Sequence, residues 1–94
     1  MIHKQHLELV DVQIITIPLN AEILSVAKQK IGGMLETLCV WYYFLGEVVD
    51  TKDIEIRIVK TGENSPNVSG SAFRGTFVME NEMVFHVFEM PQYN

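Results

Sequence analysis

Cysteine and long apolar runs are both scarce in this sequence of 94 residues, and each absence excludes a class of protein. Cys39 is the single cysteine, so no internal disulfide can form. No apolar stretch approaches the ~20 residues of a membrane-spanning helix, and no charged-then-apolar leader opens the chain. We therefore expect a protein of a reducing compartment, the cytoplasm by default, with Cys39 buried as a small hydrophobic residue.

Basic residues are also few. Seven Lys and Arg residues stand against twelve Asp and Glu residues, which gives a net charge of −5. Binding to nucleic acid without sequence preference depends on cations that neutralise phosphates, so this composition disfavours it. A hydrophobic fraction of 48% with 20% charged residues is typical of globular proteins. A chain of this length has room for one core, which predicts a single domain over residues 1–94.

Alternating apolar and polar residues predict β-strands through most of the chain. Residues 2–17 fit two strands broken near Asp11, and residues 54–58 alternate isoleucine with charged side chains. A polar surface loop is expected over Gly46–Asp53. Phe73–Met79 and Glu82–Phe88 fit a hairpin that turns near residues 80–81. The pattern predicts a mainly β domain of six or seven antiparallel strands, sandwich-like or barrel-like, with at most one short helix.

Two segments are apolar on both alternating faces, Leu38–Leu45 and Met83–Phe88. This pattern is typical of a central strand that is covered on both sides, or of a strand at a subunit contact. A small sheet normally leaves one face to water, so something must cover the second face. We therefore predict that Val84–Phe88 is central in its sheet and that the chain forms a homo-oligomer, most simply a dimer.

The stretch from Asn20 to Gly33 fits two structures. Asn20 can cap a helix over residues 21–28 that ends at Gly32 and Gly33. Residues 23–26 also fit a strand, and the two glycines would then form the turn of a hairpin. The residues alone leave both open.

Several fragments, in order along the chain, resemble a family of short, largely phage-encoded proteins known as a domain of unknown function. They are Asp11-Val12-Gln13, Ile17-Pro18, Gly75-Thr76-Phe77 and the closing strand Val84–Glu89. Two segments depart from the family pattern. Phe85 stands where a Trp is preferred before the His, and Lys60 and Glu63 flank Thr61-Gly62, where the family commonly has a Gly before Thr-Gly and a His after it. The resemblance implies a strand over residues 23–29 and a phage accessory protein in the host-cell cytoplasm, and it supplies no reaction.

The histidines offer little catalytic chemistry. His3 and His6 could hold a metal only with further ligands, and no nucleophile, paired carboxylates or metal ligands stand at the required spacing. We expect no metal, no cofactor and no enzyme activity. His86 is the lone titratable group in an apolar strand. It is either a core or interface histidine bonded to a backbone carbonyl, or part of an aromatic wall with Trp41 and Phe85 on which a planar base stacks. Trp41 also fits a place in the core.

Both arginines, Arg57 and Arg74, flank a polar loop over Thr61–Ser71, and Lys60 precedes that loop. Guanidinium groups bind phosphate with two hydrogen bonds, so these residues could hold a small anion. They could equally form surface salt bridges to Glu55, Glu63 or Glu80. No Gly-Lys-Ser/Thr motif follows the loop, which excludes a Walker-type phosphate loop.

Two functional hypotheses follow from these patterns. The first is a phage counter-defence protein that sequesters a small anionic, nucleotide-like signal without catalysis. Its predicted ligand-binding residues are Trp41, Arg57, Lys60, Thr61, Gly62, Arg74, Phe85 and His86. The alternative is a protein–protein inhibitor of a host defence enzyme, of the anti-CRISPR or anti-restriction type, that uses an exposed β edge and an aromatic patch.

Overall fold

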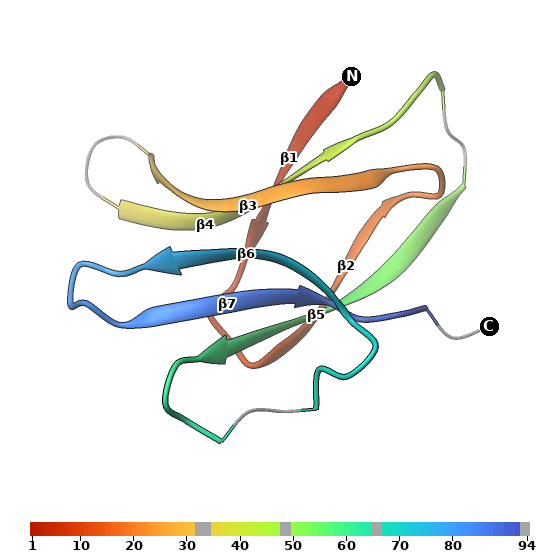
Figure 1. Cartoon of the computed structure of the whole chain (residues 1–94). Helices are drawn as coiled ribbons and strands as arrows, with labels where there is room; N and C mark the ends of the chain where they lie inside the picture. The colour runs from red at the N-terminus through yellow and green to blue at the C-terminus, as the bar shows by residue number, and fades with distance from the viewer. Residues whose placement is uncertain (32–34, 48–49, 65–66, 93–94) are drawn as a thin grey trace.

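The computed structural model describes residues 1–31, 35–47, 50–64 and 67–92, and it confirms the mainly β prediction. Seven strands are present in these ranges, and none of the described residues is helical, so no helix there could cross a membrane (Figure 1). The strands are β1 (Ile2–Leu7), β2 (Val12–Pro18), β3 (Glu22–Ile31), β4 (Leu35–Tyr43), β5 (Thr51–Lys60), β6 (Ala72–Val78) and β7 (Val84–Glu89).

The strands form two antiparallel sheets. Sheet A has the order β1-β4-β3, and sheet B has the order β2-β5-β7-β6. Figure 1 shows β3 and β4 of sheet A lying above β6 and β7 of sheet B, as the two layers of an open sandwich. β7 is an inner strand of sheet B, as predicted, because β5 and β6 pair with its two edges.

The core lies between the two sheets. Val40 of sheet A and Ile54, Ile56 and Val87 of sheet B are almost completely inaccessible to solvent. Because successive side chains of a strand point to opposite faces, the alternating isoleucines of β5 place the middle of one face of the strand in this core. Each such side chain contributes about 1.5–3 kcal/mol by leaving water.

The sheets approach each other closely where β3 packs on β6. A Cβ atom added to Gly75 would lie 2.6 Å from Cγ2 of Val26 and 3.3 Å from its carbonyl oxygen. The pairing of β6 with β7 shifts register between Phe73 and Gly75, so a bulge immediately precedes this contact. Gly75 therefore lets the edge strands of the two sheets come together.

The ambiguous stretch forms strand β3, which excludes the helix over residues 21–28. β3 pairs with β4 over its whole length, with one register shift between Ile23 and Ser25. The Ala21 amide donates to the Pro18 carbonyl at 2.9 Å, which closes a tight turn between β2 and β3. Asn20 caps no helix, since its side-chain amide donates to the Leu45 carbonyl. The predicted turn at Gly32-Gly33 lies outside the described residues.

Two boundaries test the predicted loops. β5 begins at Thr51, so the predicted loop over Gly46–Asp53 is wrong in its last three residues, which pair with β2 instead. The polar segment over Thr61–Ser71 does separate β5 from β6, although residues 65–66 lie outside the described ranges.

Candidate functional site

His86 lies on the outer face of β7, between two threonines. Its Nδ1 is 2.9 Å from Oγ1 of Thr76 on β6, and its Nε2 is 2.6 Å from Oγ1 of Thr61, at the start of the β5–β6 loop. A hydroxyl can donate or accept, so the threonines satisfy the ring in either protonation state. The predicted backbone-carbonyl partner is therefore wrong, and His86 links the loop to two strands.

The three aromatic residues predicted to form one wall lie in three different places. Trp41 is on the outer face of sheet A, because its neighbour Val40 points into the core. Phe85 packs against the core and stacks on Phe77, with ring centroids 5.3 Å apart. His86 faces outward from sheet B, as the alternation along β7 requires. The predicted wall is not assembled.

The three predicted anion-binding cations are already engaged by carboxylates. Arg57 Nε lies 2.7 Å from Glu55, and Lys60 Nζ lies 3.0 Å from Glu63. The structure thus contains both of these anticipated ion pairs. Arg74 pairs instead with Glu89, which accepts from Nε and Nη2 at 2.8 and 2.7 Å.

Glu80, the third carboxylate considered as a partner of these cations, lies between β6 and β7 and pairs with Lys30 at 3.6 Å. Gly62 follows Thr61 in the turn after β5 with a φ of 87°, a backbone conformation that favours glycine.

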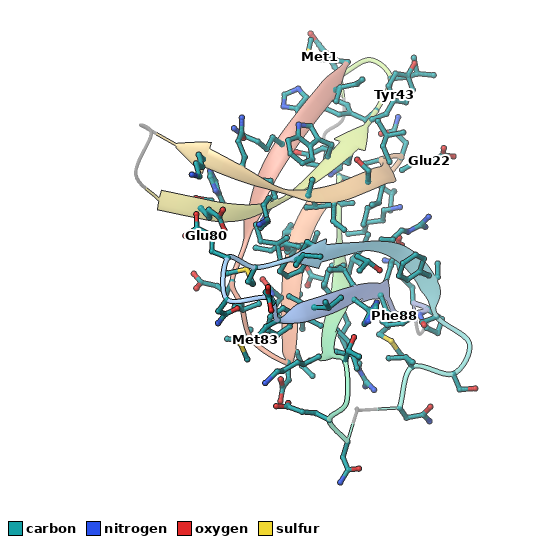
Figure 2. The ribbon with its side chains drawn as sticks, turned by 60° about the vertical axis from the view of Figure 1, so that its left-hand side comes forward. Met1, Glu22, Tyr43, Glu80, Met83 and Phe88 are labelled. Carbon is teal, nitrogen blue, oxygen red and sulfur yellow. The ribbon has the colours of Figure 1, made fainter. Side chains whose placement is uncertain are left out.

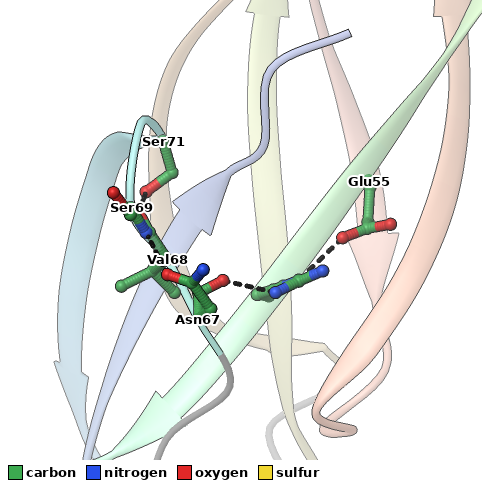
Figure 3. A network of polar contacts seen from close by, with 6 residues as sticks. Glu55, Asn67, Val68, Ser69 and Ser71 are labelled. Atoms are coloured by element: carbon green, nitrogen blue, oxygen red, sulfur yellow. Dashed lines mark hydrogen bonds and ion pairs between the residues drawn. The ribbon is translucent and has the colours of Figure 1, made fainter. Parts of the chain in front are cut away.

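Arg57 also holds the β5–β6 loop against sheet B. Its Nη1 donates to the Asn67 carbonyl, while the Asn67 side chain accepts from the Ser69 amide at 2.9 Å (Figure 3). The Ser71 hydroxyl donates to the Val68 carbonyl and closes the same turn. In this arrangement Arg57 connects Glu55 to the loop backbone, so an anion would have to displace contacts that now order the loop.

A row of side chains that the sequence analysis did not single out crosses all four strands of sheet B. Val12 pairs with Arg57, Arg57 with Phe88, and Phe88 with Phe73, so the four lie side by side on the outer face. The two phenylalanine rings meet edge to face with centroids 5.6 Å apart. We call these four residues the outer row.

The outer row stays open to solvent at both ends. Phe73 is 56% exposed and Val12 is 47% exposed, and Ile14, two residues from Val12 on the same face of β2, is 66% exposed. The sequence carried a signal for this surface, because Ile14 and Ile15 are consecutive and must therefore point to opposite faces of β2.

The family of this chain is shown by a match over its whole length. A family model described as Domain of unknown function (DUF7352) matches residues 1–94. The chain belongs to this family. No curated protein and no solved structure matches it. The resemblance to a domain of unknown function is thus confirmed for this DUF7352 domain.

Proposed function

We propose that this domain is a non-catalytic binding module that docks a protein partner through the outer face of sheet B. The observation that carries the proposal is the outer row, in which two phenylalanines and an arginine stand side by side across four strands. Aromatic and arginine side chains dominate the binding energy of many protein interfaces. An aromatic ring that is half exposed on a sheet face can be buried by a partner without any rearrangement of the core.

The setting we propose is phage counter-defence in the host cytoplasm, with a host defence enzyme of the CRISPR or restriction type as the partner. The resemblance to phage-encoded proteins supports this setting. The net charge of −5 supports it as well, because enzymes that handle nucleic acid present basic surfaces, and complementary charge accelerates association. Inhibition would follow from covering the enzyme surface, without any reaction.

The experiment compares two substitutions of exposed apolar residues on opposite sheets. Phe73→Ser removes the exposed ring of the outer row, and Leu24→Ser changes a residue of β3 that is about as exposed. We expect tagged wild-type protein and the Leu24→Ser variant to capture the same host protein from lysate, and Phe73→Ser to lose it. Capture that survives Phe73→Ser, in a variant with an unchanged circular dichroism spectrum, would move the interface elsewhere.

Sequestration of a small nucleotide-like anion is a second candidate, with a revised site. Arg57 stands next to the Phe73/Phe88 pair, so a base could stack on Phe73 while the guanidinium turns from Glu55 to a phosphate. A thermal-shift panel of nucleotides and cyclic nucleotides tests it. A ligand at 100 times its Kd would stabilise the fold by about 2.7 kcal/mol. A shift with one nucleotide and no captured protein would favour this candidate over the first.

A further inference from the structure

A pocket opens between the two sheets at the end of the sandwich where β1 and β6 finish. Its volume is about 170 Å³. Leu7, Leu38 and Phe77 form its floor, and each is a core residue less than a tenth exposed. Met79 and Leu9 add apolar walls. An apolar cavity of about 150 Å³ is large enough to hold benzene, so this pocket can take one aromatic ring or a branched aliphatic group.

The charges at the mouth of this pocket are mainly negative. Lys28 and Glu36 line it and pair with each other at 3.4 Å. Close by, Lys30 pairs with Glu80, which Figure 2 shows beside the ends of β3 and β4. Glu8 also lines the pocket and has no ion-pair partner among the described residues. Each lysine is thus offset by one glutamate, and the carboxylate of Glu8 is left over.

We propose that this pocket binds an amphiphilic cation, an apolar group about the size of one benzene ring joined by a short linker to an ammonium or guanidinium group. The ring would displace water from Leu7, Leu38 and Phe77, and the cation would lie near Glu8 and Glu36. Such a group can belong to a free aryl-alkyl amine or to a peptide in which an aromatic residue neighbours a lysine. The pocket is lined by none of the outer-row residues, so this inference is independent of the proposed function.

An anionic ligand of the same shape fits the pocket less well. Lys28 is the one cation among the described residues that line it, and Glu36 already neutralises this lysine. A carboxylate placed at the mouth would face Glu8 and Glu36 together. The two glutamates would repel this carboxylate. An ammonium group at the same place would instead gain Glu8 as a partner, and the ion pair between Lys28 and Glu36 would stay intact.

The test is an NMR titration of the full chain with phenethylamine, followed by amide shifts in ¹H–¹⁵N spectra. Phenylacetate carries the same ring with the opposite charge, and butylamine carries the charge without the ring. We expect phenethylamine to shift the amides around Leu7, Leu38 and Phe77 with a Kd of about 1 mM, as suits a ligand of so few atoms. Phenylacetate and butylamine should bind more weakly. Equal affinity for phenethylamine and phenylacetate would overturn the proposal, as would shifts confined to other parts of the chain.

Two substitutions separate the charge at the mouth from charge in general. Glu8→Gln keeps the shape of the side chain, and the two hydrogen bonds between residue 8 and Gln13 involve only the backbone of residue 8. Glu47→Gln removes an equal charge from an exposed residue beyond the far end of β4. Glu8→Gln should weaken phenethylamine binding by about two- to five-fold, and Glu47→Gln should leave it unchanged. An equal effect of both substitutions would reduce the preference to net charge and overturn the assigned site.

A third arm identifies the source of the ligand. The capped dipeptide N-acetyl-Lys-Phe-amide presents the same ring and a single ammonium group on a peptide backbone. If it binds more tightly than phenethylamine, the pocket takes a partner's side chains. If it binds more weakly, the ligand is a free amine. Binding of neither compound at about 10 mM would overturn the proposal, and it would leave the outer-row experiment unaffected.

Discussion

Gly75→Ala changes the fold at the contact between the sheets. The added Cβ would lie 2.6 Å from Cγ2 of Val26, closer than real contacts allow, and 3.3 Å from the Val26 carbonyl oxygen. Val26 cannot move aside easily, because it is buried and its strand is paired with β4, where its register partner Val40 is completely buried. Edge strand β6 must therefore shift outward, or β3 must distort.

The cost can be estimated from two opposing effects. Overpacking in a well-packed core costs about 1–3 kcal/mol. Replacing a glycine also restricts the unfolded chain, which stabilises the folded state by about 0.4–1 kcal/mol where the backbone conformation suits alanine. Gly75 is not among the glycines with positive φ, so the backbone itself adds no strain. We expect a net loss of about 1–2 kcal/mol in the free energy of unfolding.

Urea denaturation followed by Trp41 fluorescence and circular dichroism measures this loss. In a chain of 94 residues, 1 kcal/mol corresponds to a fall in Tm of about 4–8 °C. The double variant Val26→Ala/Gly75→Ala is the control, because it removes Cγ2 and with it the closest clash. Its loss should be smaller than the sum of the two single losses by at least about 0.5 kcal/mol. A Gly75→Ala protein as stable as wild type, or strictly additive losses, would refute the reasoning.

Two further predictions concern sheet B. Arg57→Ala should accelerate hydrogen exchange at the Ser69 amide, because it removes the hydrogen bond to the Asn67 carbonyl that holds the loop, and it should cost no more than about 1 kcal/mol of stability, because the lost ion pair with Glu55 is partly exposed; unchanged exchange would show that the loop orders itself. Light scattering of the protein alone at micromolar concentration should give the mass of two chains that pair through the outer row, and the Phe73→Ser variant should give a lower mass. A host partner would then take the place of the second chain on this face. A wild-type mass of one chain contradicts the dimer.

The sequence predicted the strands well because burial in a sheet leaves a period of two. The isoleucines of β5 and the position of β7 inside its sheet both follow from that pattern. The same pattern says whether a side chain faces in or out, but not which of two sheets carries its strand. Trp41 and His86 were therefore expected together, although they lie on the outer faces of opposite layers.

Of the ion pairs, one could be predicted from the sequence and another could not. Arg57 and Glu55 are two residues apart on one strand, so they share a face, and their pairing could be predicted from sequence. Arg74 and Glu89 are fifteen residues apart, and their contact depends on the register of the β6–β7 hairpin. The predicted turn near residues 80–81 placed the two strands together, but the bulge before Gly75 shifts the pairing there and could not be read from the residues.

The sequence also indicated that other residues must cover the second apolar face of both β4 and β7. In the structure, the outer face is covered at Cys39 of β4 and is less covered at Phe88 of β7. On β4, the side chain of Cys39 points outward but is completely buried by side chains of the two neighbouring strands. His6 of β1 lies 3.8 Å and Gln29 of β3 lies 4.0 Å from its sulfur. Lys4 holds Gln29 in this position, because its Nζ donates a 2.7 Å hydrogen bond to Oε1 of Gln29. On β7, the outward Phe88 lies between Arg57 and Phe73, and Phe73 is itself more than half exposed. Since burying each further Å² of apolar surface contributes about 25 cal/mol, a partner gains more on sheet B than around Cys39, whether it is a host protein or a second copy of the chain.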